Sequence, residues 1–212
     1  MSIHVNSSLK LYMESAIAAP VAITAITKAE PGVLSATGHT FANGDTVLLE
    51  IQGMVELHGY LCKVVNVVAS TSFQVAGVDG TAGIDTTLFS TFSSGTAKKV
   101  TLGTSIVGVQ EFAFAGGEIK TTDTTTVNDT VDTQIVVGAT AQSADMTMQW
   151  DPSAAAQQAM ITAFKTRSNK GFKVLWPDGA FAMWYGTVGY TGAPGGGKQG
   201  VTTSPAKITM LG

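Results

Sequence analysis

The stretch ADMTMQW, residues 144–150, shows most clearly which kind of fold the chain adopts. Met146, Met148 and Trp150 alternate with polar residues, and a period of two places them on one face of a strand, against a core. Similar short runs of β-branched and aromatic residues occur along most of the chain, so we predict a mainly β protein. The predicted strands are 8–14, 21–27, 46–52, 60–68, 72–76, 98–102, 105–115, 134–138, 144–150, 172–176, 180–190 and 206–211.

The continuation of this stretch, DPSAAAQQAMITAF, predicts a single long helix. Asp151 suits the N-cap, and Pro152 suits the first turn because its missing N–H is not needed there. Gly171 is expected to end the helix. Such an amphipathic helix is expected to cover one face or edge of a sheet. Its apolar stripe consists of Ala156, Met160, Ala163 and Phe164.

The composition excludes several classes of protein. Only 13% of the 212 residues are charged, about half of the ~25% usual for soluble domains. Lys and Arg number 12 against 15 Asp and Glu, which excludes a basic nucleic-acid-binding protein. The 44% of apolar residues argues against disorder, and neither a membrane helix nor a signal peptide is expected. The sparsely charged surface must be covered by hydroxyl and amide groups, or by other chains.

The acidic charge is concentrated in one part of the sequence. Residues 20–98 contain three Lys against six Asp or Glu, whereas the remainder of the chain is neutral. Turn-rich runs lie near the end of this acidic part. We therefore predict an inserted all-β module at 20–97, held within a β domain formed by 1–19 and 98–212.

The segment Lys120–Thr133, KTTDTTTVNDTVDT, is predicted to be a long loop. Loops of this length in a compact domain are either functional or disordered. Its three acids, Asp123, Asp129 and Asp132, do not have the spacing of an EF-hand, so a solvated or subunit-bridging loop is favoured over a calcium site.

A second polar segment, Tyr190–Gly200, resembles a phosphate-binding loop in its spacing of Gly192, Gly197 and Lys198. Gln199 stands where Ser or Thr would bind magnesium, and no helix follows to bind phosphate. A flexible hairpin loop is therefore favoured over a nucleotide site.

The remaining residues of types that can catalyse reactions or bind metals are expected to have structural roles only. The histidines lack the spacing of metal ligands and are expected to be solvated or in turns; they are His4, His39 and His58. Cys62 is expected to be a small apolar residue of a strand. Core or interface packing is favoured for the three tryptophans, Trp150, Trp176 and Trp184. Since no catalytic or metal-binding group emerges, we predict that the protein is not an enzyme and has no cofactor or metal.

Several segments together resemble the tail tube protein (major tail protein) family of long-tailed bacteriophages. The matching features are the W-D-P helix start, the W-P-D-G turn, the strand ending in G-T-V, and a last strand that closes on Gly, in GVTTSPAKITMLG. SIVGVQEFAFAGGEIKTTD is similar to the strand that leads into the family's long Thr/Asp loop. The acidic insert, with GHTFANGDTVLLEIQGMVELHGYLCKVV and TSFQVAG, resembles a small β module of phage particle proteins.

The resemblance implies a β-sandwich or barrel-like tail tube fold with one flanking α-helix. It implies that six copies form a ring, and that stacked rings form the tail tube through which DNA is ejected. It further implies contacts with tape measure, tail terminator and distal tail proteins, non-specific passage of double-stranded DNA, and no membrane partner. The protein would belong to the virion tail after assembly in the host cytoplasm, and a non-contractile, siphovirus tail is favoured. The insert is expected outside the tube.

Candidate contact residues between subunits follow from this resemblance. Those in the long loop are Lys120, Thr122, Asp123, Thr124, Asp129 and Asp132; those on the helix are Asp151, Met160 and Phe164. Of three alternatives, one, an enzyme, would need an acid or base at a cleft that the sequence does not display. The other two stay open. One is a capsid decoration or minor tail protein, and the other is a carbohydrate-binding β-sandwich that uses Trp176, Trp184 and Tyr185.

Overall fold

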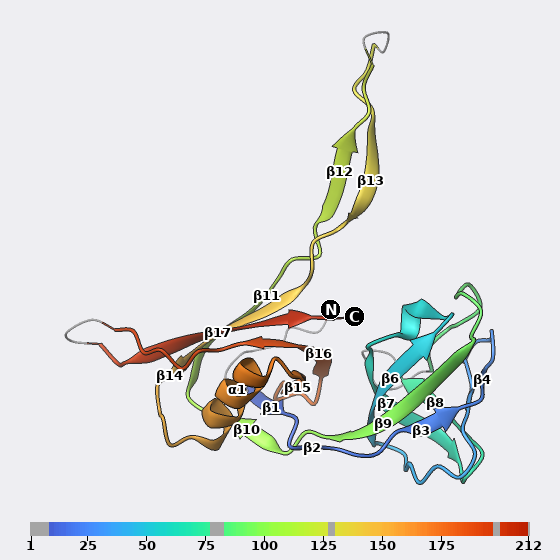
Figure 1. Cartoon of the computed structure of the whole chain (residues 1–212), viewed down its shortest axis with the longest axis horizontal. Coiled ribbons are helices and arrows are strands. Elements are labelled where there is room, and N and C mark those ends of the chain that lie inside the picture. The colour runs from blue at the N-terminus through green and yellow to red at the C-terminus, as the bar shows by residue number, and fades with distance from the viewer. Residues whose placement is uncertain (1–8, 77–82, 127–129, 197–199, 212) are drawn as a thin grey trace.

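The computed structural model describes residues 9–76, 83–126, 130–196 and 200–211, and every structural statement below concerns these ranges. The chain is mainly β, as predicted, and its strands pair antiparallel. Two larger sheets, called sheet A and sheet B, lie side by side, and a two-stranded hairpin extends away from them (Figure 1).

Sheet A has seven strands, and its two edges nearly meet. β10 and β11 lie at opposite edges, yet only Val107 and Gly108 separate them in the sequence. The sheet curls as a result, so that the ring of Trp184 lies 5.2 Å from that of Phe114, three strands away. This is the barrel-like form that was predicted. The order is β10 (Thr104–Ile106), β1 (Lys10–Met13), β15 (Asn169–Leu175), β16 (Phe181–Gly189), β17 (Thr203–Met210), β14 (Ser143–Gln149) and β11 (Val109–Ala115).

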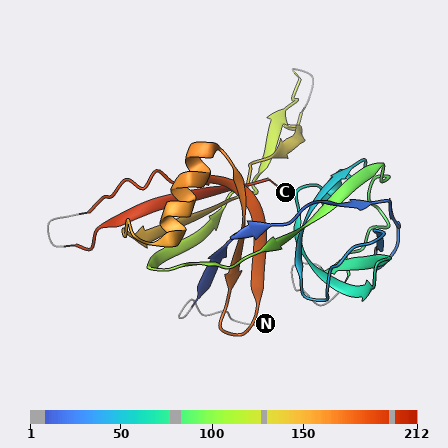
Figure 2. The same cartoon turned by 60° about the horizontal axis from the view of Figure 1, so that its bottom comes forward.

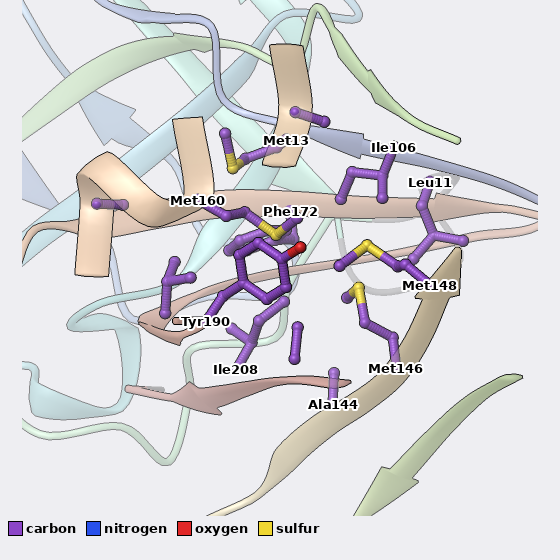
Figure 3. Close-up of a cluster of buried hydrophobic side chains, with 14 of the residues drawn as sticks. Leu11, Met13, Ile106, Ala144, Met146, Met148, Met160, Phe172, Tyr190 and Ile208 are labelled. Atoms are coloured by element: carbon purple, nitrogen blue, oxygen red, sulfur yellow. The ribbon is translucent and has the colours of Figure 1, made fainter. Parts of the chain in front are cut away.

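The main core lies between one face of sheet A and the helix α1 (Ala155–Thr166), which Figure 2 shows lying across the strands. Along β14 the buried and less buried residues alternate, because one face points to the helix. In Figure 3, Met160 of α1 lies beside Phe172 and Tyr190. Other members of this core are Leu11, Met13, Ile106, Ala144, Met146, Met148, Val174, Val188, Ala206 and Ile208.

A buried hydrogen-bond network holds α1 on the sheet. The side chain of Gln157 is buried, and its Nε2 donates to the carbonyl oxygen of Gln149 at 2.6 Å. Its Oε1 accepts from the Tyr190 hydroxyl at 2.8 Å and from the Asp151 N–H at 3.1 Å. Because these buried polar groups have partners, the network fixes the position of the helix without an unpaired group.

The predicted helix ends were wrong. Ala154 is the N-cap, and Asp151 instead accepts hydrogen bonds from the N–H and Oγ of Ser153, at 2.9 and 2.6 Å. This local bond makes a turn that competes with helix at the start of the predicted segment. The C-cap is Arg167, in the left-handed conformation with φ 52°. Gly171 lies in β15 instead.

Sheet B has eight strands and also closes on itself. β3 and β4 are separated only by Thr24; β3 pairs with β9 while β4 pairs with β5, at the other end of the sheet. The strands lie between residues 16 and 101. They are β2 (Ala16–Ile17), β9 (Ser94–Thr101), β6 (Thr46–Gln52), β7 (Leu61–Val68), β8 (Ser72–Ala76), β5 (Leu34–Ser35), β4 (Ala25–Ile26) and β3 (Val21–Ile23), with a 3₁₀ turn at Val55–Leu57. The residues at the centre of its core include Leu34, Val47, Leu49, Ile51, Met54, Val64, Phe73 and Ala97.

Sheet B packs on the face of sheet A that points away from α1. Leu48, Leu61 and Val100 of sheet B form an apolar cluster with Met183 and Tyr185 of β16. The approach is close at Gly171, where a Cβ would lie 3.3–3.4 Å from the side chains of Leu61, Leu102 and Val100. The two sheets are therefore in direct contact.

A buried ion pair lies where the chain leaves β1 toward sheet B. The Glu14 carboxylate is buried; it is 2.9 Å from the ammonium of Lys170 and accepts from the Gly171 N–H at 3.1 Å. Removing Lys170 would take the cation away from the buried Glu14 carboxylate and leave it the hydrogen bond from the Gly171 N–H. No helix in the described ranges has the length and apolar character needed to cross a membrane.

Candidate assembly surfaces

The hairpin formed by β12 (Ile119–Asp123) and β13 (Gln134–Ala139) is called the arm. It projects far beyond both sheets (Figure 1), and all residues of both strands are exposed. The predicted loop at 120–133 was therefore partly wrong, since its first residues are a strand. Its residues gave no strand signal because neither face of the arm is buried, so no alternation was selected.

The arm exposes apolar side chains of types normally found inside proteins. The exposed fractions are 68% for Ile119, 55% for Ile135, 66% for Val136 and 57% for Val137. An isolated two-stranded hairpin is only marginally stable in water, and this one has no third strand among the described residues. Exposed β-branched residues on such a ribbon form an apolar surface that is available for contact with another chain.

Two glycines set the direction of the arm. Gly116 and Gly117 have φ values of +89° and +80°, a region that other residues rarely adopt. A Cβ on Gly116 would lie 2.3 Å from the carbonyl oxygen of Ala141, on the opposite side of the hairpin. The Gly117 N–H donates to the carbonyl oxygen of Thr140 at 3.1 Å. The base of the arm is thus closely packed backbone.

Hydrogen bonds order the described part of the arm's outer end. Asp123 accepts from the Oγ1 and the N–H of Thr125, at 2.5 and 2.8 Å. These bonds, the side-chain bond first, lower the pKa of Asp123, so its carboxylate is charged at neutral pH. The Thr124 N–H donates to the Thr133 carbonyl oxygen at 2.9 Å, which connects the two sides of the hairpin.

The remaining candidate contact residues of the arm either lie apart from Asp123 and Thr124 or fall outside the described residues. Lys120 lies near the base, where the ladder has a bulge, and Thr122 pairs with Ile135. Asp132 is exposed. Asp129 lies outside the described residues, as do His4, Gly197 and Lys198.

The helix candidates differ in their accessibility. Met160 is fully buried in the core of its own chain, so a neighbouring copy has no access to it. Phe164 is 42% exposed, although its position was read as part of the core stripe. Asp151 is exposed, and its bonds from Ser153, the side-chain bond first, lower the pKa of its carboxyl group. Only Asp151 and Phe164 remain as candidate contacts on this helix segment.

The structure gives little support to a sugar-binding platform. Trp184 is 4% exposed and stacks on Phe172 inside the core, with ring centroids 6.0 Å apart. Trp150, predicted to face the core, is 39% exposed, and its Nε1 donates to the carbonyl oxygen of Gly192 at 3.1 Å. A buried Trp184 cannot stack on a glycan.

The remaining chemically active residues have structural surroundings. His39 was expected to be solvated or in a turn, but it is buried; its Nε2 lies 3.2 Å from the carbonyl oxygens of Val68 and Ser72. Burial raises the pKa of the Cys62 thiol from 9.0 to about 12, so it is not a nucleophile at neutral pH. In the described ranges, no three His, Cys, Asp or Glu side chains are grouped so that they could hold a metal ion.

Two surface features were not found from the sequence. One is a groove of about 300 Å³ beside the base of the arm, lined by Phe114, Trp184 and Met210 among others. The other is a pair of lysines, Lys63 and Lys173, that share one aromatic ring. These lysines are far apart in the sequence, and no local pattern could bring them together.

A comparison with protein families matches residues 53–212 to a family described as phage tail tube protein. The match extends from the second half of sheet B through the arm, α1 and the last strands of sheet A. None of the curated proteins that were compared matches the chain.

Proposed function

Because the chain belongs to the phage tail tube protein family, whose members are structural components of the virion tail, we propose that its copies form stacked hexameric rings that make up the tail tube. The tube would be the conduit for DNA ejection. Assembly with its own copies and with other tail proteins follows from the family; the tape measure, tail terminator and distal tail proteins are the partners that we propose.

The observation that carries this proposal is the arm. Its strands present Ile119, Ile135, Val136 and Val137 to solvent in the isolated chain. Burying one such side chain stabilises a contact by about 1.5–3 kcal/mol. Contact with a second copy that covers the arm would be stabilised by several such side chains at once. Each copy would contact one neighbour through its own arm and bind the arm of another. We propose that the arm bridges rings.

The distribution of charge supports a conduit for DNA. Each Lys or Arg that faces the channel would add salt-dependent affinity for phosphate and slow the passage of DNA. The residues outside 20–98 carry no net charge, and the chain as a whole carries −3. We propose that sheet A and the arm form the tube wall, and that its surface does not hold DNA tightly.

We propose that sheet B is the inserted module and decorates the outside of the tube. Its strands lie between residues 16 and 101, close to the predicted limits of 20 and 97. It packs on one face of sheet A as a closed barrel with its own core, and a body of this size would obstruct a channel. Density for it inside the channel, in electron micrographs of tubes, would refute this placement.

The test replaces two apolar arm residues by serine, in the variant Ile135→Ser/Val136→Ser. We expect a folded chain with an unchanged melting temperature, because both side chains are solvent-exposed, and a loss of long tubes in negative-stain micrographs. The matched control is Val55→Ser/Val68→Ser, at an exposed valine of the 3₁₀ turn and an exposed valine of β7. Normal tubes from the arm variant, or equal losses in both, would contradict the proposed role of the arm. Wild-type protein that never forms tubes or rings would contradict the proposed function.

A further inference from the structure

Lys63 and Lys173 come together where the two sheets meet. Lys63 belongs to β7 of sheet B and Lys173 to β15 of sheet A. The ring of Phe181 lies within reach of both ammonium groups, which are 5.6 and 5.1 Å from its centroid. All three side chains are partly exposed. We call Lys63 and Lys173 the junction lysines.

The charges of the junction lysines are not compensated by carboxylates in the described part of the chain. The ion pairs found there join other residues: Lys98 with Glu50, Lys99 with Asp45, Lys170 with Glu14 and Lys207 with Asp145. The pKa of Lys173 is lowered by burial and, to a smaller extent, by the charge of Lys63. The face of Phe181 attracts each cation, but it has no full negative charge. Two like charges therefore share one small surface that is open to an anion.

We propose that the junction lysines bind the carboxylates at the outer end of a second copy's arm, Asp123 and Asp132. This proposal rests on the proposed function, because it names the surface that receives the arm. The charges are complementary: the Asp123 carboxyl group has a lowered pKa and is ionised, and Asp132 is exposed close to the same end. Opposite charges across an interface fix its register and steer association.

The position of the junction gives this contact a structural consequence. One lysine belongs to each sheet, so an arm bound there touches sheet A and sheet B of its neighbour at once. Arm docking then also holds the module against the tube wall. The apolar arm residues supply most of the buried area, and the carboxylates determine which surface the arm meets.

A charge exchange tests the proposal. We compare the concentration needed for tube formation in the wild type, in Lys63→Glu/Lys173→Glu, in Asp123→Lys/Asp132→Lys, and in all four changes combined. Each double reversal should raise the concentration needed for tube formation by about tenfold or more. The variant with all four changes should bring it most of the way back to the wild-type value. The control, Lys28→Glu/Lys165→Glu, changes one exposed lysine in each part of the chain and should leave assembly near normal. If the reversal at the junction prevents folding, as seen in the melting curve, Lys63→Met/Lys173→Met replaces it and should weaken assembly in the same direction.

The outcomes separate this proposal from the proposed function. Wild-type tubes together with normal assembly of both reversals would overturn the docking site and leave the tube function standing. A loss at the junction that the arm reversal neither reproduces nor rescues would show that another anion binds there, which also overturns the proposal. Rescue by the combined variant is the result that we predict.

Discussion

The glycine at the base of the arm provides the sharpest single-residue test. In Gly116→Ala, the new Cβ would lie 2.3 Å from the carbonyl oxygen of Ala141 and 3.0 Å from the Cα of Gln142. Both obstacles are backbone atoms on the other side of the hairpin, so no side-chain rotation relieves them. The two chain segments must separate where they enter the arm, while the core under α1 is not touched.

The displacement can be estimated from the geometry. Normal contact requires the two segments to move apart by about 1 Å, and strands are spaced by about 4.8 Å, so the arm rotates by roughly 12°. The seven residues from the base to Thr124 span about 23 Å at ~3.3 Å per residue. The outer end of the arm therefore moves by about 5 Å, the distance between neighbouring strands.

A shift of this size misaligns the arm with its neighbour. Loss of a single apolar contact such as that of Val136 costs about 1.5–3 kcal/mol. At ~1.4 kcal/mol per factor of ten, association weakens by at least about tenfold per arm. The φ of +89° adds about 1–3 kcal/mol of strain, which falls on the arm itself because its base can open without unfolding the core.

The assay measures melting temperature by circular dichroism and tube formation by light scattering over a series of concentrations. Gly179→Ala is the control: its φ of +88° is similar, but a Cβ there has no atom within 4 Å. We expect both variants to keep the fold and only Gly116→Ala to require a much higher concentration for assembly. Equal assembly of the two variants would refute the reasoning that the arm's direction matters.

Two further predictions concern the interior. Tyr190→Phe removes the hydrogen bond to Gln157 Oε1, which still accepts a hydrogen bond from the Asp151 N–H. We therefore expect the free energy of unfolding, measured in urea, to fall by about 1 kcal/mol. An unchanged free energy would mean that this bond does not help to hold α1 on the sheet. The thiol of Cys62, with its pKa raised to about 12, should resist iodoacetamide at pH 8 until the protein is unfolded. Since the thiol of the unfolded chain ionises near 9.0, the free energy of unfolding should decrease as the pH rises from about 9 toward 12. Rapid labelling of the folded protein would contradict the burial of Cys62.

Much of the fold could be predicted from strands and a helix that are buried on one face and exposed on the other. β6 and β8 have the predicted limits of 46–52 and 72–76. In β8 the buried Phe73 and Val75 alternate with partly exposed residues, whereas in β6 the consecutive Val47, Leu48 and Leu49 are buried on both faces of the strand, and a short apolar run is the signal. Three of the four stripe residues of α1, Ala156, Met160 and Ala163, face the core as predicted, whereas Phe164 is exposed. An element that is buried on one side has a periodic pattern of apolar residues in the sequence, and this pattern predicts the element.

The elements that were missed lack this signal. β5 has only two residues, and β12 is exposed on both faces. The helix start was misplaced because Asp151 can bond to Ser153 as readily as it can cap a helix. For the candidate site, the first residues of the predicted loop at 120–133 form β12, and the exposed apolar residues Ile135 to Val137 belong to β13, which follows the predicted loop. The junction lysines depend on contact between the two sheets, which no local pattern contains.

The most direct test of the central claim is a cryo-electron microscopy reconstruction of the assembled protein. We predict a tube of stacked rings in which the arms, including Ile135 and Val136, are buried against other copies. Tubes in which the arms point into solvent, or protein that stays monomeric at all concentrations, would contradict it.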